Sequence, residues 1–284
     1  MNYIDVFFQS EDGLRLYARD YPGPSETSPV VLCLPGLTRN SKDFADVANV
    51  LCENYRVICP DQRGRGRSAR DPDPSRYRPD QYAVDMRVLM DVLKLPEVVV
   101  IGTSLGGLMA ILLMATIPAR IKAAVLNDVG PVVDPRGVSR ISAYVGKTAP
   151  AKTWAEAVQQ TATTNAAAFP DFTERDWQVM ARDVYIQEGQ APVLDYDPAI
   201  AMGLSTGTAA PNLWPLFDMA TGKPLLVIRG QDSDILSVET LAEMSRRLPQ
   251  LIALNIEGRG HAPTLSEPQA KDAIKRFLRS LDAA

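Results

Sequence analysis

The sequence predicts an α/β protein built on a mostly parallel eight-stranded sheet with helices on both faces. Short runs rich in β-branched and apolar residues alternate with longer helical patterns. The later runs are almost continuously apolar, as expected of strands that are covered on both faces. The chain has 284 residues, of which 46% are hydrophobic, enough for one substantial core with an inserted subdomain.

The expected strands follow one another along the chain. The first two flank a Ser-Glu-Asp-Gly turn and predict an antiparallel hairpin, whereas the others alternate with helical segments. The eight expected strands are Asp5–Gln9, Leu14–Asp20, Val30–Leu34, Arg56–Cys59, Glu97–Ile101, Ala123–Asn127, Leu225–Arg229 and Ile252–Ile256. Helices are expected at about residues 42–53, 80–94, 105–117, 238–248 and 267–281.

The segment from residue 131 to residue 215 differs in composition from its flanks. Strand-like runs disappear there, and Ala, Thr, Gln and aromatic residues dominate. All three tryptophans (Trp154, Trp177 and Trp214) lie in this segment, and its aromatic content argues against a disordered linker. We therefore expect a core formed by residues 1–130 and 216–284, and a helical cap formed by residues 131–215.

The bulk properties predict a soluble, cytoplasmic protein that binds neither nucleic acid nor a membrane. A formal net charge of −4 provides no field that would gather nucleic acid or an anionic membrane surface. Cys33, Cys52 and Cys59 are too few and odd in number for a disulfide framework, so we expect buried thiols in a reducing compartment. No secretory signal is visible, and glycines interrupt the longest apolar stretch, Val98–Ile117. The oligomeric state stays open.

Gly102-Thr103-Ser104-Leu105-Gly106 follows an expected strand directly and opens an expected helix. A serine on such a sharp turn projects its hydroxyl above the sheet edge, and the glycines avoid clashes where strand and helix meet. The helix N-terminus adds a positive dipole and an N–H group where negative charge develops during acyl transfer. This pentapeptide alone occurs by chance in many proteins, but its context predicts that Ser104 is a nucleophile.

A serine nucleophile needs a neighbouring base, and the chain contains one histidine, His261. This residue lies in a glycine-containing loop, after the last expected strand and before the C-terminal helix. In a parallel sheet that loop lies at the same edge as Ser104. A lone histidine is often a residue without a role, but this position favours a general base. A single histidine also excludes a His-rich zinc site, so neither a metal nor a cofactor is expected.

From about Leu14 to the C-terminus, the chain resembles the α/β-hydrolase superfamily. Residues 34–38, Leu-Pro-Gly-Leu-Thr, are similar to its His-Gly-x loop, although proline stands where histidine is common. Residues 61–68 resemble its Asp-x-Arg-Gly-x-Gly-x-Ser stretch, for which a structural role is expected, and Gly260-His261 matches its Gly-His ending. The resemblance implies that the backbone N–H groups of Leu37 and Leu105 form an oxyanion hole.

The aspartate that orients His261 has two candidates. The superfamily most often carries this acid after the strand that corresponds to Leu225–Arg229. Here Ser233 stands at that position with an aspartate on either side, which makes Asp234 one candidate. We favour Asp128, at the carboxyl end of the preceding strand, because some superfamily members carry their acid there. Either aspartate could instead be a turn or cap residue.

Arg39 follows Leu37 by two residues and is expected at the mouth of the oxyanion loop. Its guanidinium can clamp a substrate carboxylate through two parallel hydrogen bonds. The alternative is a loop arginine paired with a nearby acid such as Asp43.

These residues predict a serine hydrolase that cleaves a small carboxylic ester or lactone through an acyl-enzyme. Hydrolysis of amides and of carbon–carbon bonds uses the same machinery and remains open. The alternative from another functional class is a ligand receptor. Such a protein keeps a hydrolase pocket but turns its ligand over slowly or not at all.

Overall fold

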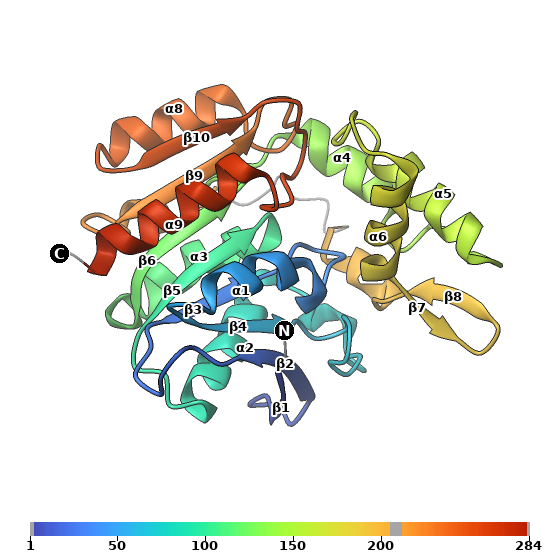
Figure 1. The fold of residues 1–284 in the computed structure, drawn as a ribbon, viewed down its shortest axis with the longest axis horizontal. Coiled ribbons are helices and arrows are strands. Elements are labelled where there is room, and N and C mark those ends of the chain that lie inside the picture. Colours follow the sequence, from blue (N-terminus) through green and yellow to red (C-terminus); the bar gives the residue numbers. More distant parts are fainter. Residues whose placement is uncertain (1–2, 205–211, 283–284) are drawn as a thin grey trace.

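A computed structural model describes residues 3–204 and 212–282, and an eight-stranded sheet forms its centre (Figure 1). The strand order is β1-β2-β4-β3-β5-β6-β9-β10. The pairs β1–β2 and β2–β4 are antiparallel, and the other five pairs are parallel. The mostly parallel sheet and the N-terminal hairpin predicted from the sequence are thus confirmed.

All eight expected strands are present, with bounds within two residues of those expected. The strands of the sheet are β1 (Ile4–Gln9), β2 (Arg15–Tyr21), β3 (Val30–Leu34), β4 (Arg56–Asp61), β5 (Val98–Thr103), β6 (Ile121–Asn127), β9 (Leu225–Gly230) and β10 (Ile252–Ile256). The helices that flank it are α1 (Ala45–Leu51), α2 (Pro79–Val92), α3 (Leu105–Thr116), α7 (Trp214–Asp218), α8 (Val238–Arg247) and α9 (Pro268–Asp282).

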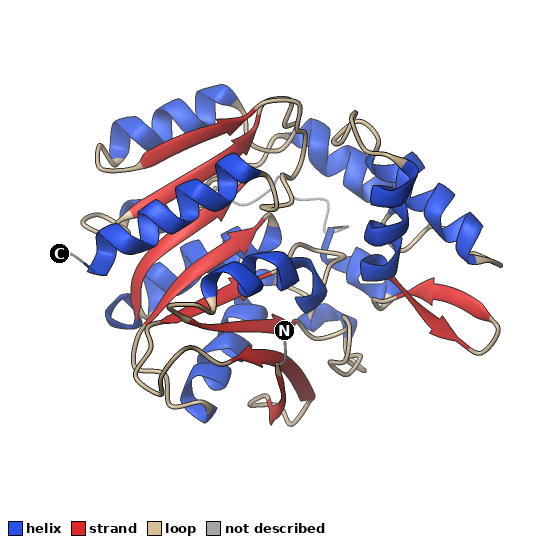
Figure 2. Cartoon of the chain, in the orientation of Figure 1, coloured by secondary structure: helices blue, strands red, loops and turns tan. Residues whose placement is uncertain are grey.

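The sheet separates two hydrophobic layers because successive side chains of a strand point to opposite faces. On β5, Val99 and Ile101 pack in the layer that contains the apolar side chains of α1 and α9. Val98 and Val100 pack on the other face, with those of α2, α3, α7 and α8. Figure 2 shows helices on both sides of the sheet. Among the described residues, no helix combines the length and apolarity required to cross a membrane.

The segment that follows β6 projects to one side of the sheet (Figure 1). It contains α4 (Pro135–Tyr144), α5 (Trp154–Asn165), α6 (Glu174–Val184) and the 3-10 segment η4 (Pro198–Leu204). It also contains an antiparallel hairpin, β7 (Tyr185–Glu188) with β8 (Ala191–Leu194), which the sequence pattern did not indicate. Part of the predicted cap, residues 205–211, lies outside the described residues, as do 1–2 and 283–284 of the predicted core. We call residues 131–215 the cap segment.

The Arg-Gly stretch after β4 contributes a buried ionic cluster. The side chain of Arg63 is completely buried and donates to Asp85 at 2.8 and 2.6 Å. It also donates to Asp71 at 2.5 Å and to Asp12 at 2.9 Å. The cluster therefore ties the loop after β4 to α2 and to the β1–β2 hairpin.

We expect Arg63→Met to lower the free energy of unfolding by about 3–5 kcal/mol, because the buried Asp85 would lose its cation and the buried Asp71 would keep only Arg76, 3.3 Å away. Urea denaturation followed by circular dichroism measures this change. Arg67→Met is the matched control. Arg67 is half-exposed and pairs with the exposed Asp5, so its loss should cost about 1 kcal/mol or less. Equal losses in the two variants would contradict the assignment of a structural cluster.

Candidate active site

Ser104 lies on a sharp turn between β5 and α3. Its backbone adopts φ 53° and ψ −114°, a conformation that residues other than glycine rarely adopt. The turn closes tightly, since a Cβ atom at Gly102 would overlap the backbone of Gly106, and a Cβ atom at Gly106 would overlap the carbonyl of Leu34. The backbone thus holds the Ser104 hydroxyl at the carboxyl edge of the sheet.

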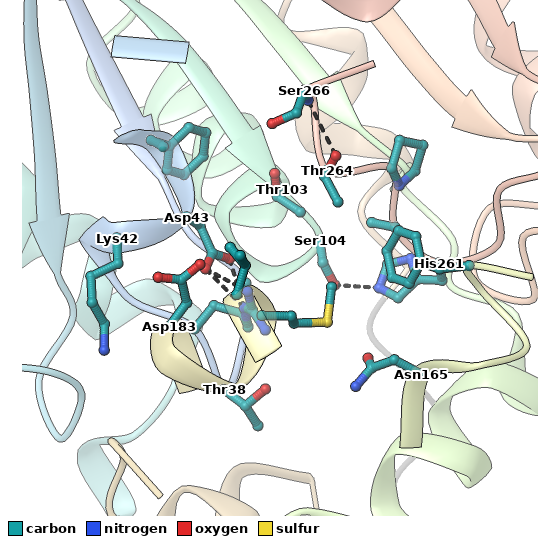
Figure 3. Close-up of a pocket in the computed structure, with 18 of the residues that line it drawn as sticks. Thr38, Lys42, Asp43, Thr103, Ser104, Asn165, Asp183, His261, Thr264 and Ser266 are labelled. Carbon is teal, nitrogen blue, oxygen red and sulfur yellow. Dashed lines mark hydrogen bonds and ion pairs between the residues drawn. The ribbon is translucent and has the colours of Figure 1, made fainter. Parts of the chain in front are cut away.

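Three side chains that are distant in the sequence meet at this edge, and Figure 3 shows Ser104 and His261 among them. The Oγ atom of Ser104 lies 2.8 Å from Nε2 of His261. Nδ1 of the same ring lies 2.8 Å from Oδ2 of Asp128. With the proton on Nδ1 donated to Asp128, Nε2 is left to accept the hydrogen bond from Ser104. The predicted nucleophile, base and favoured acid therefore form one hydrogen-bonded array.

The Asp128 carboxylate is completely buried and directed by three donors. Besides His261, it accepts a hydrogen bond of 2.8 Å from the backbone N–H of Gly230 and one of 2.6 Å from the hydroxyl of Ser233. Each donor comes from the end of a strand or the loop that follows it. These bonds compensate the carboxylate for its lost hydration and fix its orientation toward the imidazole.

The alternative acid, Asp234, does not contact His261 in the structure. Arg140 of α4 binds its carboxylate through two hydrogen bonds of 2.6 and 2.8 Å, and this guanidinium holds the pKa of Asp234 below its ordinary value. Its neighbour Ser233 contributes to the site instead. The sequence analysis assigned no function to Ser233. The signal that could have identified this residue is its position, because the superfamily usually carries the acid there.

The two predicted oxyanion donors flank Ser104. Leu105 is the first residue of α3, and Leu37 lies in the loop after β3. Neither backbone N–H has a hydrogen-bond acceptor in the part of the chain that the structure describes. The carbonyl of Leu37 accepts a 2.8 Å hydrogen bond from Nε of the buried Arg65, which fixes the peptide of the loop. Sequence analysis did not single out Arg65 for this role.

A cavity of about 440 Å³ opens in front of Ser104 and His261, between the core and the cap segment. Its walls combine apolar and aromatic side chains of the cap segment, namely Ile141, Tyr144, Phe169, Phe172, Val179 and Met180. Arg39 lines this cavity as predicted, but its Nε and Nη2 atoms bind the carboxylate of Asp43 at 2.7–2.9 Å. This is the pairing that the sequence offered as the alternative to a carboxylate clamp.

The loop that carries Leu37 is also attached to the cap segment. Nδ2 of Asn40 donates to the Asp195 carboxylate at 3.0 Å and to the carbonyl of Asp183 at 3.1 Å. Nζ of Lys42 lies 3.0 Å from the same Asp195 carboxylate. The end of β8 and the end of α6 are thereby tied to the edge of the site.

Comparison with known proteins identifies the family of this chain. Residues 29–268 match the model of the α/β-hydrolase fold, and the chain belongs to this family. It is 36% identical to a 3-hydroxybutyrate-oligomer hydrolase of Cupriavidus necator over 271 residues, 91% of each protein. It is 25% identical to a 2-(acetamidomethylene)succinate hydrolase of Mesorhizobium japonicum, over 90% of this chain and 89% of that protein. A crystal structure of an α/β hydrolase from Novosphingobium aromaticivorans matches with a TM-score of 0.92 and 44% identity, over 98% of each chain. These similarities support general hydrolase activity.

We expect Asp128→Asn to lower kcat by about 10³-fold or more, because the amide keeps the shape but loses the charge that stabilises the imidazolium. Asp234→Asn should lower kcat only a few-fold, since Asp234 pairs with Arg140. Steady-state kinetics with one ester substrate compares the two variants. A larger loss of kcat in Asp234→Asn would show that Asp234 is the acid that orients His261, at the strand end where the superfamily usually carries this residue.

Ser233→Ala should lower kcat by about 10-fold, because the buried Asp128 carboxylate then loses one of its three donors. Ser245→Ala, on the following helix, is the control, since its hydroxyl donates only to the carbonyl of Leu241. Equal kcat values in these two variants would show that Ser233 does not help to orient the Asp128 carboxylate.

Proposed function

We propose that this protein is a serine hydrolase that cleaves a carboxylic ester through an acyl-enzyme intermediate. The observation that carries the proposal is the continuous hydrogen-bonded array from Ser104 through His261 to Asp128, beside a cavity large enough for a small molecule. Such an array activates a hydroxyl that is otherwise a weak nucleophile.

The mechanism follows from the array. His261 accepts the Ser104 proton through Nε2 while Oγ attacks the ester carbonyl, and the Asp128 carboxylate stabilises the imidazolium that forms. The N–H groups of Leu37 and Leu105 bind the tetrahedral oxyanion. The imidazolium then gives its proton to the departing alcohol. In the second half, His261 takes a proton from water, whose oxygen attacks the acyl-enzyme. The bond between the acyl group and Oγ breaks, the imidazolium returns its proton to Ser104, and the carboxylic acid leaves.

An ester of a small hydroxy acid is the substrate that we favour. The relative with 36% identity is named for hydrolysis of 3-hydroxybutyrate oligomers, whose units are joined by ester bonds. A lactone, which is a cyclic ester, is cleaved by the same steps. Amides and carbon–carbon bonds stay alternatives because the same nucleophile and base serve them. The mixed apolar and polar walls of the cavity suit a short acyl chain.

The proposal includes a role for the cap segment and a cellular location. The cap segment covers the substrate and excludes water from the reacting atoms, a role supported by the six apolar and aromatic side chains that it contributes to the cavity. A reducing, cytoplasmic location is supported by Cys33, Cys52 and Cys59, all buried and unpaired.

Ser104→Ala should lower kcat by 10⁴-fold or more for p-nitrophenyl esters of short acids, with the fold retained by circular dichroism. The residual rate would come from oxyanion binding alone. A phosphonate directed at serine should label the unaltered protein at Ser104, as read by mass spectrometry of its peptides, and should leave Ser104→Ala unlabelled.

Labelling at another residue, or an active Ser104→Ala variant, would remove the proposed nucleophile. Binding of these esters without turnover would favour the receptor alternative. A panel of matched esters and amides separates ester from amide hydrolysis, since both share the acyl-enzyme but differ in the leaving group.

A further inference from the structure

One polar wall of the cavity carries more negative than positive charge. Arg39 and Lys42 are its two cations, and each already has a carboxylate partner. Arg39 is bound by Asp43 at 2.7–2.9 Å, and Lys42 lies 3.0 Å from Asp195. Asp183 lines the cavity as a further carboxylate, so the two cations and the acids Asp43, Asp195 and Asp183 together carry an excess of negative charge. Two more acids, Asp46 and Asp176, also line the cavity.

Asp183 lies near the end of α6 and faces the cavity beside Asp43 (Figure 3). Its position is fixed from the core side, because its backbone carbonyl accepts a hydrogen bond of 3.1 Å from Nδ2 of Asn40. Across residues 3–204 and 212–282, its carboxylate forms neither a hydrogen bond nor an ion pair. The cavity thus presents a hydrogen-bond acceptor that the protein itself does not satisfy.

Burial raises the pKa of Asp183 to about 6, and repulsion from Asp43 adds to this effect. The charges of Arg39, Lys42 and Arg19 oppose the shift without cancelling it. Because the half-buried carboxylate of Asp183 has no donor within the protein, a hydrogen-bond donor on a ligand would stabilise it strongly. A second carboxylate entering here would meet repulsion rather than an unpaired cation.

A small recess of about 50 Å³ adjoins the same wall and shares Thr38, Arg39, Tyr144 and Asn165 with the main cavity. Its lining is rich in neutral polar groups, including Thr148, Gln160 and Thr164. The recess has room for a hydroxyl or methyl group but not for a long chain. Size and polarity both suit a short, neutral, hydroxyl-bearing end of a substrate.

We propose that Asp183 is a specificity-determining residue that accepts a hydrogen bond from a hydroxyl group on the acyl part of the substrate. This inference rests on the proposed ester hydrolysis and deepens it. An ester formed between two hydroxy acids has a hydroxyl at its acyl end and a carboxylate at its other end. The excess of negative charge at this wall directs the hydroxyl end to Asp183 and the carboxylate end away from it.

The test compares two esters that differ by one hydroxyl, p-nitrophenyl 3-hydroxybutyrate and p-nitrophenyl butyrate. The unaltered protein should favour the hydroxylated ester by about 10-fold or more in kcat/KM, since a hydroxyl donating to a carboxylate is a charge-assisted bond. Asp183→Leu should bring the ratio of the two kcat/KM values below about 2-fold. Asp183→Asn, which keeps an acceptor oxygen, should give an intermediate ratio.

A second, independent test uses a substrate that carries a negative charge. With p-nitrophenyl hemisuccinate, Asp183→Asn should raise kcat/KM, because it removes a negative charge near the carboxylate of this substrate. Arg39→Ala combined with Asp43→Asn removes this ion pair without changing the net charge, and it should show no selective rise of KM for hemisuccinate, because the guanidinium of Arg39 binds Asp43 and not the substrate. A selective rise would restore the carboxylate clamp and overturn the inference.

Glu174→Gln is the matched control, because Glu174 is an exposed acid on the same helix that does not line the cavity. It should keep the ratio of the unaltered protein. Both Asp183 variants should fold with a Tm at pH 8 no lower than that of the unaltered protein. The reason is that a carboxyl with a raised pKa in the folded state destabilises that state once it ionises.

Binding separates failure of this inference from failure of the proposed function. In Ser104→Ala, methyl 3-hydroxybutyrate should bind more tightly than methyl butyrate by calorimetry, and Asp183→Leu added to that variant should remove the difference. This measurement needs no turnover, so it decides the inference even if no ester is hydrolysed. Equal binding of the two esters, or a preference that survives Asp183→Leu, would overturn it, whereas an active Ser104→Ala variant overturns only the proposed nucleophile.

Discussion

The buried carboxylate of Asp128 is the interaction on which the geometry of the site depends. It accepts hydrogen bonds from the backbone after β9, from the hydroxyl of Ser233 and from the imidazole of His261. Because a buried carboxylate is strongly destabilised without donors, these three contacts hold the ends of β6, β9 and β10 in one relative position. The imidazole then has one orientation, and its other nitrogen points to Ser104.

The central sheet was predictable because its strands are short apolar runs with clear boundaries. Val30–Leu34 and Ile252–Ile256 agree with the observed strands at both ends. The hairpin β7–β8 was not predictable in this way, since each strand has only four residues and mostly partly or fully exposed side chains. Its residues therefore lack the alternation of polar and apolar positions that marks a half-buried strand.

The site was predictable where the local sequence determines the backbone. The glycines around Ser104 and the loop around the single histidine indicated both positions. The ranking of Asp128 above Asp234 depended on resemblance, and in the structure Asp128 contacts His261 whereas Asp234 does not. Arg140, which is 94 residues away in the sequence, neutralises Asp234. Ion pairs of this kind join side chains that are far apart in the sequence, and no motif encodes them. The pair of Arg39 with Asp43 is local, and the sequence had offered it as an alternative.

The attachment of the loop after β3 to the cap segment has a consequence for access to the site. Asn40 and Lys42 both bind Asp195, and Asn40 also binds the end of α6. A displacement of α6 wide enough to admit a ligand must stretch or break these bonds. Because Leu37 belongs to the same short loop, any such displacement would also shift the backbone N–H group of Leu37, which lies at the edge of the cavity.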